Sequence, residues 1–95
     1  MTRDLVLSQI QTALDAIEMH LRGIEVDQSI SRIDKEQLLH FRKALMSMNA
    51  KVERGDSKGF RPWMGRAIVD GWPPASRLGD LILQAEEAFS RYSEI

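Results

Sequence analysis

Three segments of this 95-residue chain repeat apolar residues at alternating spacings of three and four, and this periodicity constrains the fold most. Such spacing puts the apolar side chains on one stripe of an α-helix, whereas a half-buried strand needs them at every second position. The chain is therefore predicted to be all-α. The stripes are Leu7, Ile10, Leu14, Ile17, Leu21 and Ile24; Leu38, Phe41, Leu45, Met48 and Val52; and Leu78, Ile82, Ala85, Phe89 and Tyr92.

Capping residues and glycines predict where the first two helices begin and end. The first covers residues 2–22, with Gly23 as its stop. The second begins after Asp34, which caps free backbone donors while Gln37 reaches back to it, and ends before Gly55. Because the connection between them is short, the two helices are expected to pair antiparallel.

A short helix is predicted between the second and last stripes. Pro62 suits its first position, and it is expected to reach Asp70 with Gly71 as its stop. The last helix begins at Ser76, which can cap it. Nine residues span only about 14 Å, so the short helix is a lid or corner and not an equal bundle member. Residues 1–95 are thus expected to form one domain, a small bundle of three long amphipathic helices plus one short helix.

The sequence lacks the residues that most catalytic and metal-binding sites need. There is no cysteine, which excludes disulfides, thiolate metal sites and cysteine nucleophiles. Glu36 and His40 are one helical turn apart, but no further ligand accompanies them, and Glu86 with Glu87 is interpreted as solvated helix surface. We therefore expect no enzyme activity, no metal and no cofactor.

Neither a membrane span nor a leader peptide is expected. No apolar run exceeds four residues, far short of the roughly 20 needed to cross a bilayer, and the first residues lack the apolar run of a signal peptide. A cytoplasmic location without membrane contact is expected.

The net charge of −1 hides a basic island in the middle of the chain. Residues 42–66 hold seven basic and two acidic groups, residues 1–41 hold four and seven, and residues 67–95 hold two and five. The island either contacts nucleic acid or an acidic protein, or neutralises acidic helices packed beside it. The second interpretation is favoured.

The stretch from residue 58 to 66 interleaves basic residues with aromatics, a methionine and two glycines. It could plug the end of the bundle, contact a protein through residue types common in interface centres, or contact nucleic acid by stacking and phosphate binding. Its glycines, with Gly71, suggest a hinged element. The candidate partner-binding residues of this segment and its continuation are Phe60, Arg61, Trp63, Met64, Arg66 and Trp72.

Several apolar residues of the first two helices lie off the main stripes and have no predicted partner within one chain. Small residues with adaptable methionines suit contact with another chain. A homodimer is therefore expected. Its candidate contact residues are Leu5, Ala16, Met19, Leu39 and Met46.

In functional type, the chain is similar to small helical bacterial proteins that bind and occlude a partner, such as anti-activators, antitoxins, immunity proteins and secretion chaperones. No residue motif selects among them. The function expected is a non-enzymatic protein-interaction module, with a transcriptional regulator as one candidate partner. The alternative is a nucleic-acid-binding accessory protein that uses residues 42–66, although the overall pI of about 6.1 speaks against it.

Overall fold

The computed structural model describes residues 2–23, 35–55, 63–72 and 76–93, and all regular secondary structure in these ranges is α-helical. The predicted all-α architecture of three long helices and one short helix is confirmed. The helices are α1 (Arg3–Leu21), α2 (Lys35–Arg54), α3 (Met64–Gly71) and α4 (Arg77–Ser93).

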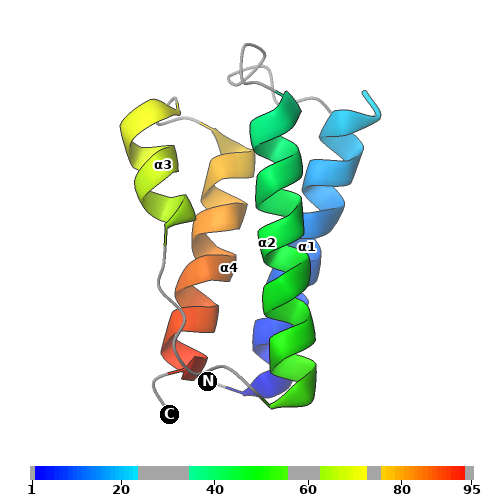
Figure 1. Cartoon of the computed structure of the whole chain (residues 1–95), viewed down its shortest axis with the longest axis vertical. Coiled ribbons are helices and arrows are strands. Elements are labelled where there is room, and N and C mark those ends of the chain that lie inside the picture. Colours follow the sequence, from blue (N-terminus) through cyan, green and yellow to red (C-terminus); the bar gives the residue numbers. More distant parts are fainter. Residues whose placement is uncertain (1, 24–34, 56–62, 73–75, 94–95) are drawn as a thin grey trace.

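The three long helices lie side by side, and α3 lies along one half of α4 at the edge of the bundle (Figure 1). Helix α1 packs against both α2 and α4, while α3 packs on α4. Figure 1 also shows that α1 and α2 run in opposite directions, so the expected antiparallel pairing is confirmed. The placement of α3 fits the corner role expected from its length.

The ends of α1 follow the predicted signals. The Thr2 side-chain oxygen accepts a hydrogen bond from the Leu5 backbone N–H at 3.3 Å, which satisfies one of the donors left free at a helix start. Gly23 has a φ of 72°, the left-handed conformation that closes a helix and that other residues adopt at a cost.

The buried row of α1 is rotated from the predicted one. Leu7, Leu14 and Leu21 are only partly buried, whereas Ile10 and Ile17 are fully buried, as predicted. Because α1 contacts two long helices, the centre of its buried face lies between them, and the three leucines fall at its edge. Ile24 lies outside the described residues. The fully buried row is Val6, Ile10, Ala13 and Ile17.

In α2, every residue of the predicted stripe is buried. The helix ends at Arg54 and Gly55 follows with a φ of 72°, as predicted. The expected cap Asp34 lies outside the described residues. Gln37, expected to reach back to that cap, accepts a hydrogen bond on its side-chain oxygen from the indole Nε1 of Trp72 at 3.1 Å.

The boundaries of α3 differ slightly from the prediction, whereas the start of α4 agrees with it. Helix α3 begins at Met64 and includes Gly71, which does not adopt a positive φ; the expected first residue, Pro62, lies outside the described residues. Helix α4 is capped by Ser76, whose hydroxyl oxygen accepts a hydrogen bond from the Gly79 N–H at 2.9 Å. All predicted stripe residues of α4 are buried except Tyr92, which is half-buried.

Within the described residues, no helix is both long and apolar enough to cross a membrane.

Candidate partner-binding surface

Helix α3 is held in place by a carboxylate from another helix. The side chain of Glu86 on α4 is buried, and its oxygens accept hydrogen bonds from the backbone N–H groups of Trp63 at 3.2 Å, Met64 at 2.8 Å and Gly65 at 2.8 Å. The first N–H groups of a helix have no partner within it, and the helix dipole makes that end partly positive. Trp63, the capping position of α3, offers no side-chain cap. Glu86 therefore replaces the missing cap and fixes α3 to α4.

Two glycines allow α3 and α4 to approach closely. A Cβ added at Gly65 would lie 2.9 Å from both the Glu86 Oε1 and the Leu83 Cδ2. A Cβ at Gly79 of α4 would lie 3.1 Å from the Trp72 ring. Gly65 was expected to act as a hinge, but it lies within a helical turn and provides the space in which the Glu86 carboxylate sits.

An aromatic cluster joins α3 to α2. The ring of Phe41, which is fully buried, lies 5.4 Å from the ring of Trp63 and 5.4 Å from the ring of Trp72, measured between centroids. Both ring pairs are tilted, an arrangement that aromatic side chains favour. With the Trp72–Gln37 hydrogen bond, this cluster holds both ends of α3 against α2.

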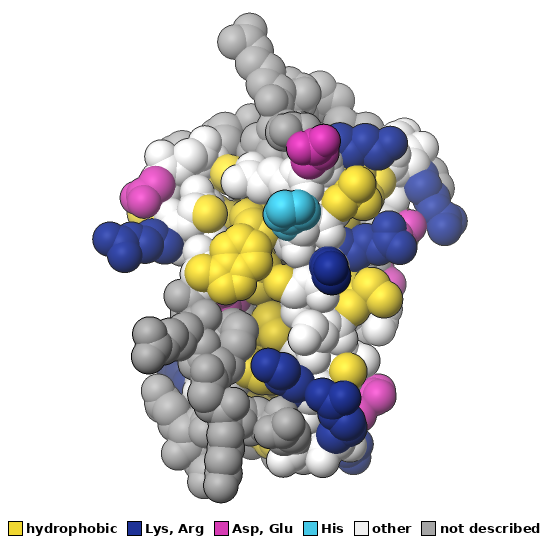
Figure 2. Space-filling view, in the orientation of Figure 1, with side chains coloured by type: hydrophobic (Ala, Val, Ile, Leu, Met, Phe, Trp, Pro, Cys, Tyr) yellow, Lys and Arg dark blue, Asp and Glu magenta, His cyan; other side chains and the backbone are white. Residues whose placement is uncertain are grey.

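The outward side of α3 combines an exposed aromatic, a basic and an aliphatic side chain. Trp63 is 45% exposed and Val69 is 73% exposed, and Arg66 is exposed between them in the sequence. These residues are spaced three apart, so they share one side of the helix. We call Trp63, Arg66 and Val69 the α3 surface. Figure 2 shows exposed hydrophobic side chains in this region, where α3 meets α2.

The predicted partner-binding residues divide into three groups in the structure. Trp63 and Arg66 are exposed, so both remain candidates. Met64 is fully buried and Trp72 is 6% exposed, so neither offers surface to a partner in this conformation, and both belong to the core. Their burial follows from their positions on the side of α3 that faces the bundle. The two remaining candidates, Phe60 and Arg61, lie outside the described residues.

The predicted dimer contacts lie on two sides of α1. Leu39 and Met46 of α2 are exposed. Both lie within about 60° of Arg42 around α2. Arg42 pairs with Glu18 of α1 at 3.0 Å. Leu5 and Ala16 are instead in one row with Gln9, which faces α4, and Met19 lies at the outer edge of this row. Ala16 is partly buried against the core, whereas Leu5 and Met19 are exposed. A single flat contact would not cover both groups without burying the polar outer side of α1.

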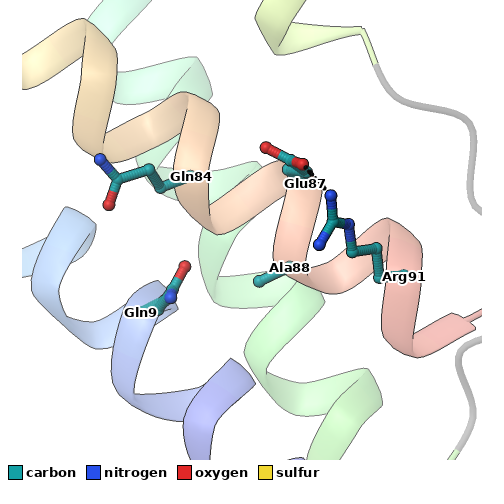
Figure 3. A pocket seen from close by; sticks show the side chains of 5 residues that line it. All are labelled: Gln9, Gln84, Glu87, Ala88 and Arg91. Carbon is teal, nitrogen blue, oxygen red and sulfur yellow. Dashed lines mark ion pairs between the residues drawn. The ribbon is translucent and has the colours of Figure 1, made fainter. Parts of the chain in front are cut away.

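A surface hollow lies between α1 and α4 (Figure 3). It is lined by Gln9, Gln84, Glu87, Ala88 and Arg91, and Glu87 pairs with Arg91 at 2.7 Å. The paired side chains are exposed to water, Arg91 to 64% and Glu87 to 63%. In the described part of the chain, no group of three or more acidic, histidine or cysteine side chains is placed to hold a metal ion.

The basic island is only partly described, and one of its members is paired. Arg42 forms its ion pair with Glu18, which also contacts Arg22 at 3.3 Å. Lys51 and Arg54 lie in the last turn of α2, where basic side chains are favourable because the helix dipole is negative there. Figure 2 shows Lys and Arg side chains on this face both in its lower half and at its upper right.

The prediction from the sequence was wrong for Glu86. It was expected with Glu87 on the solvated surface, but it is 5% exposed and buried against α3. Two signals could have indicated this: Glu86 follows the core residue Ile82 by four positions and precedes the core residue Phe89 by three, and the start of α3 lacks a capping side chain.

No family model and no curated protein matches this chain.

Proposed function

We propose that the protein is a non-enzymatic interaction module that binds and occludes a protein partner, with the α3 surface as its principal contact. The observation that carries this proposal is Trp63, whose side chain is 45% exposed although its ring packs against Phe41. Tryptophan and arginine are the residue types most enriched among the residues that dominate binding energy. A large apolar side chain left half in water beside an arginine is therefore suited to contact another protein.

The rigidity of α3 supports the same proposal. Ordering a mobile segment on binding costs free energy, so a contact held in advance binds more tightly for the same area. Glu86 and the Phe41 cluster hold α3 at both ends, and Trp63 and Arg66 are thereby presented on a fixed helix. We include in the proposal a cytoplasmic location and a regulatory role of the anti-activator, antitoxin or immunity type, with a transcriptional regulator as one candidate partner.

The experiment compares what three immobilised proteins retain from a lysate of the organism of origin: wild type, Trp63→Ala and Leu5→Ala. Leu5 is the matched control because it is exposed to the same degree, 46% against 45%, but lies on α1. The proposal predicts one protein that wild type and Leu5→Ala retain and Trp63→Ala loses. Truncating an anchor costs about 2 kcal/mol or more of binding, which is roughly a 30-fold weaker Kd. Circular dichroism of each variant checks that it folds.

A second candidate function is nucleic-acid binding by the basic end of α2. The observation that favours it is the clustering of Lys51 and Arg54 there with the outward Lys43. Phosphate contacts would make the binding fall steeply with salt. This candidate would be favoured over the first if the protein retains nucleic acid and Trp63→Ala retains it equally. The retention should also be lost above moderate salt and be reduced by Lys51→Gln.

A further inference from the structure

The outer side of the α1–α2 pair, which we call the α1–α2 seam, has apolar residues repeating every seven positions. Seven residues are close to two helical turns, so each series forms a row along its helix. The row on α1 is partly buried, whereas on α2 Leu39 is 39% and Met46 is 54% exposed. The rows are Leu7, Leu14 and Leu21 on α1, and Leu39 and Met46 on α2.

Two contacts between α1 and α2 show which residues of the two rows lie at the same level along the bundle axis. Arg42 of α2 pairs with Glu18 of α1 at 3.0 Å, and the Arg3 guanidinium donates a hydrogen bond to the backbone oxygen of Glu53 at 3.2 Å. Because the helices run antiparallel, residues near 21 are level with residues near 39, and residues near 14 with residues near 46. The Glu18–Arg42 pair thus lies between two apolar levels, with its side chains 34% and 40% exposed.

The charged groups at the middle of the seam are Glu18 on α1 and Arg42 on α2, and each is partly exposed. A two-fold axis parallel to the helices would place α1 of one copy against α2 of a second copy, antiparallel and at two equivalent contacts. Glu18 of each copy would then lie opposite Arg42 of the other. The seam is therefore complementary to itself in charge, as an isologous contact requires.

From this arrangement we propose that a second copy of the chain docks its own α1–α2 seam on this one, so that the four helices complete an antiparallel bundle. Leu14 and Met46 face the axis of that bundle from each copy, and Glu18 and Arg42 of the two copies form a four-membered ion-pair network at its middle. The seam lies on the opposite side of the bundle from α3 (Figure 1), so self-association leaves both α3 surfaces free. The proposal does not depend on the proposed function.

The size and polarity of the seam set the expected affinity. Two helices of about 28 Å length and 10 Å width cover roughly 600 Å² per copy, or about 1,200 Å² in total. This is the lower end of the range for specific interfaces, and the buried ion pairs contribute little net affinity. A dimer that dissociates in the micromolar range is expected.

The test is sedimentation equilibrium of wild type, Met46→Glu and Leu5→Glu over a concentration series. Leu5 is the matched control because it is 46% exposed and lies on the α4 side of α1. We expect wild type and Leu5→Glu to shift from 10.8 kDa to twice that mass with rising concentration. Met46→Glu should raise the dimer Kd at least tenfold while its circular dichroism spectrum stays helical.

A second variant changes a charged residue of the seam and leaves the apolar rows unchanged. Arg42→Glu places like charges opposite each other across the proposed contact and should raise the dimer Kd, with the difference from wild type shrinking as salt is added. A wild-type mass of 10.8 kDa at every concentration up to the millimolar range would overturn the proposal. So would equal weakening by Leu5→Glu and Met46→Glu, or dimers unaffected by Met46→Glu and Arg42→Glu.

Discussion

The substitution Glu86→Gln isolates the charge that caps α3 while keeping the size of the side chain. In the structure, two backbone N–H groups donate to Glu86 Oε2 and one donates to Oε1. A glutamine keeps only one of these two acceptors, and its NH₂ group then faces backbone donors. The loss thus includes at least one hydrogen bond to a charged group and the favourable interaction of the charge with the helix dipole.

The expected decrease in the free energy of unfolding follows from these losses and from one gain. A hydrogen bond to a charged group contributes about 1.5–3 kcal/mol, and a charge at a helix end about 0.3–1 kcal/mol. The amide is easier to bury than the carboxylate, which offsets part of this. We expect Glu86→Gln to lower the free energy of unfolding by about 2 kcal/mol, which corresponds to a Tm lower by roughly 8–16 °C for a domain of this size.

Urea denaturation followed by circular dichroism measures this cost, with Glu87→Gln as the control. Glu87 is the neighbouring residue, its side chain is 63% exposed, and its ion pair with Arg91 is on the surface, so its loss should cost less than about 0.5 kcal/mol. Hydrogen exchange adds a local readout, because the amide protons of Met64 and Gly65 should exchange faster in Glu86→Gln. If the two variants are equally stable, or if those amides exchange as in wild type, the capping role assigned to Glu86 is wrong.

Three further substitutions and one control test the packing around α3 and α4, each by chemical denaturation. Gly65→Ala should destabilise the protein by about 1–3 kcal/mol because its methyl group overlaps Glu86, whereas Gly71→Ala, with nothing within 4 Å of its Cβ, should be neutral or slightly stabilising; equal effects would contradict the close approach. Ser76→Ala should cost about 1 kcal/mol through loss of the α4 cap, and no change would show that the cap bond is not formed in solution. Phe41→Ala should cost about 3–5 kcal/mol, and a cost below about 1 kcal/mol would contradict its place between the two tryptophans.

The stripe of α2 could be predicted residue by residue because its five apolar members coincide with the buried face of the helix. On α1 the prediction selected Leu7, Leu14 and Leu21 for the core, although the most buried row includes Val6 and Ala13. Both rows have helical spacing, and only the positions of α2 and α4 around α1 decide between them. The spacing in the sequence is therefore sufficient to assign the helix and insufficient to orient it.

The two tryptophans show how far the candidate site could be predicted. The sequence allows either Trp63 or Trp72 to belong to the core or to a partner contact, and it does not decide between these roles. In the structure both rings pack on Phe41, but Trp63 is 45% exposed and Trp72 only 6%. Trp72 is the buried one because Gly79 makes room for its ring and Gln37 accepts its indole hydrogen, and both contacts come from other helices.

Site-specific photo-crosslinking at position 69 tests the central claim, that α3 contacts a protein partner. Val69 is 73% exposed on the α3 surface, so a photoreactive amino acid there is accommodated without disturbing the core, and the same residue at exposed Gln84 on α4 serves as the control. In cells of the organism of origin, we expect one protein adduct from position 69, distinct from the chain itself, that is absent from position 84 and lost when Trp63→Ala is added. An adduct to nucleic acid, or the same set of proteins from both positions, would contradict the claim.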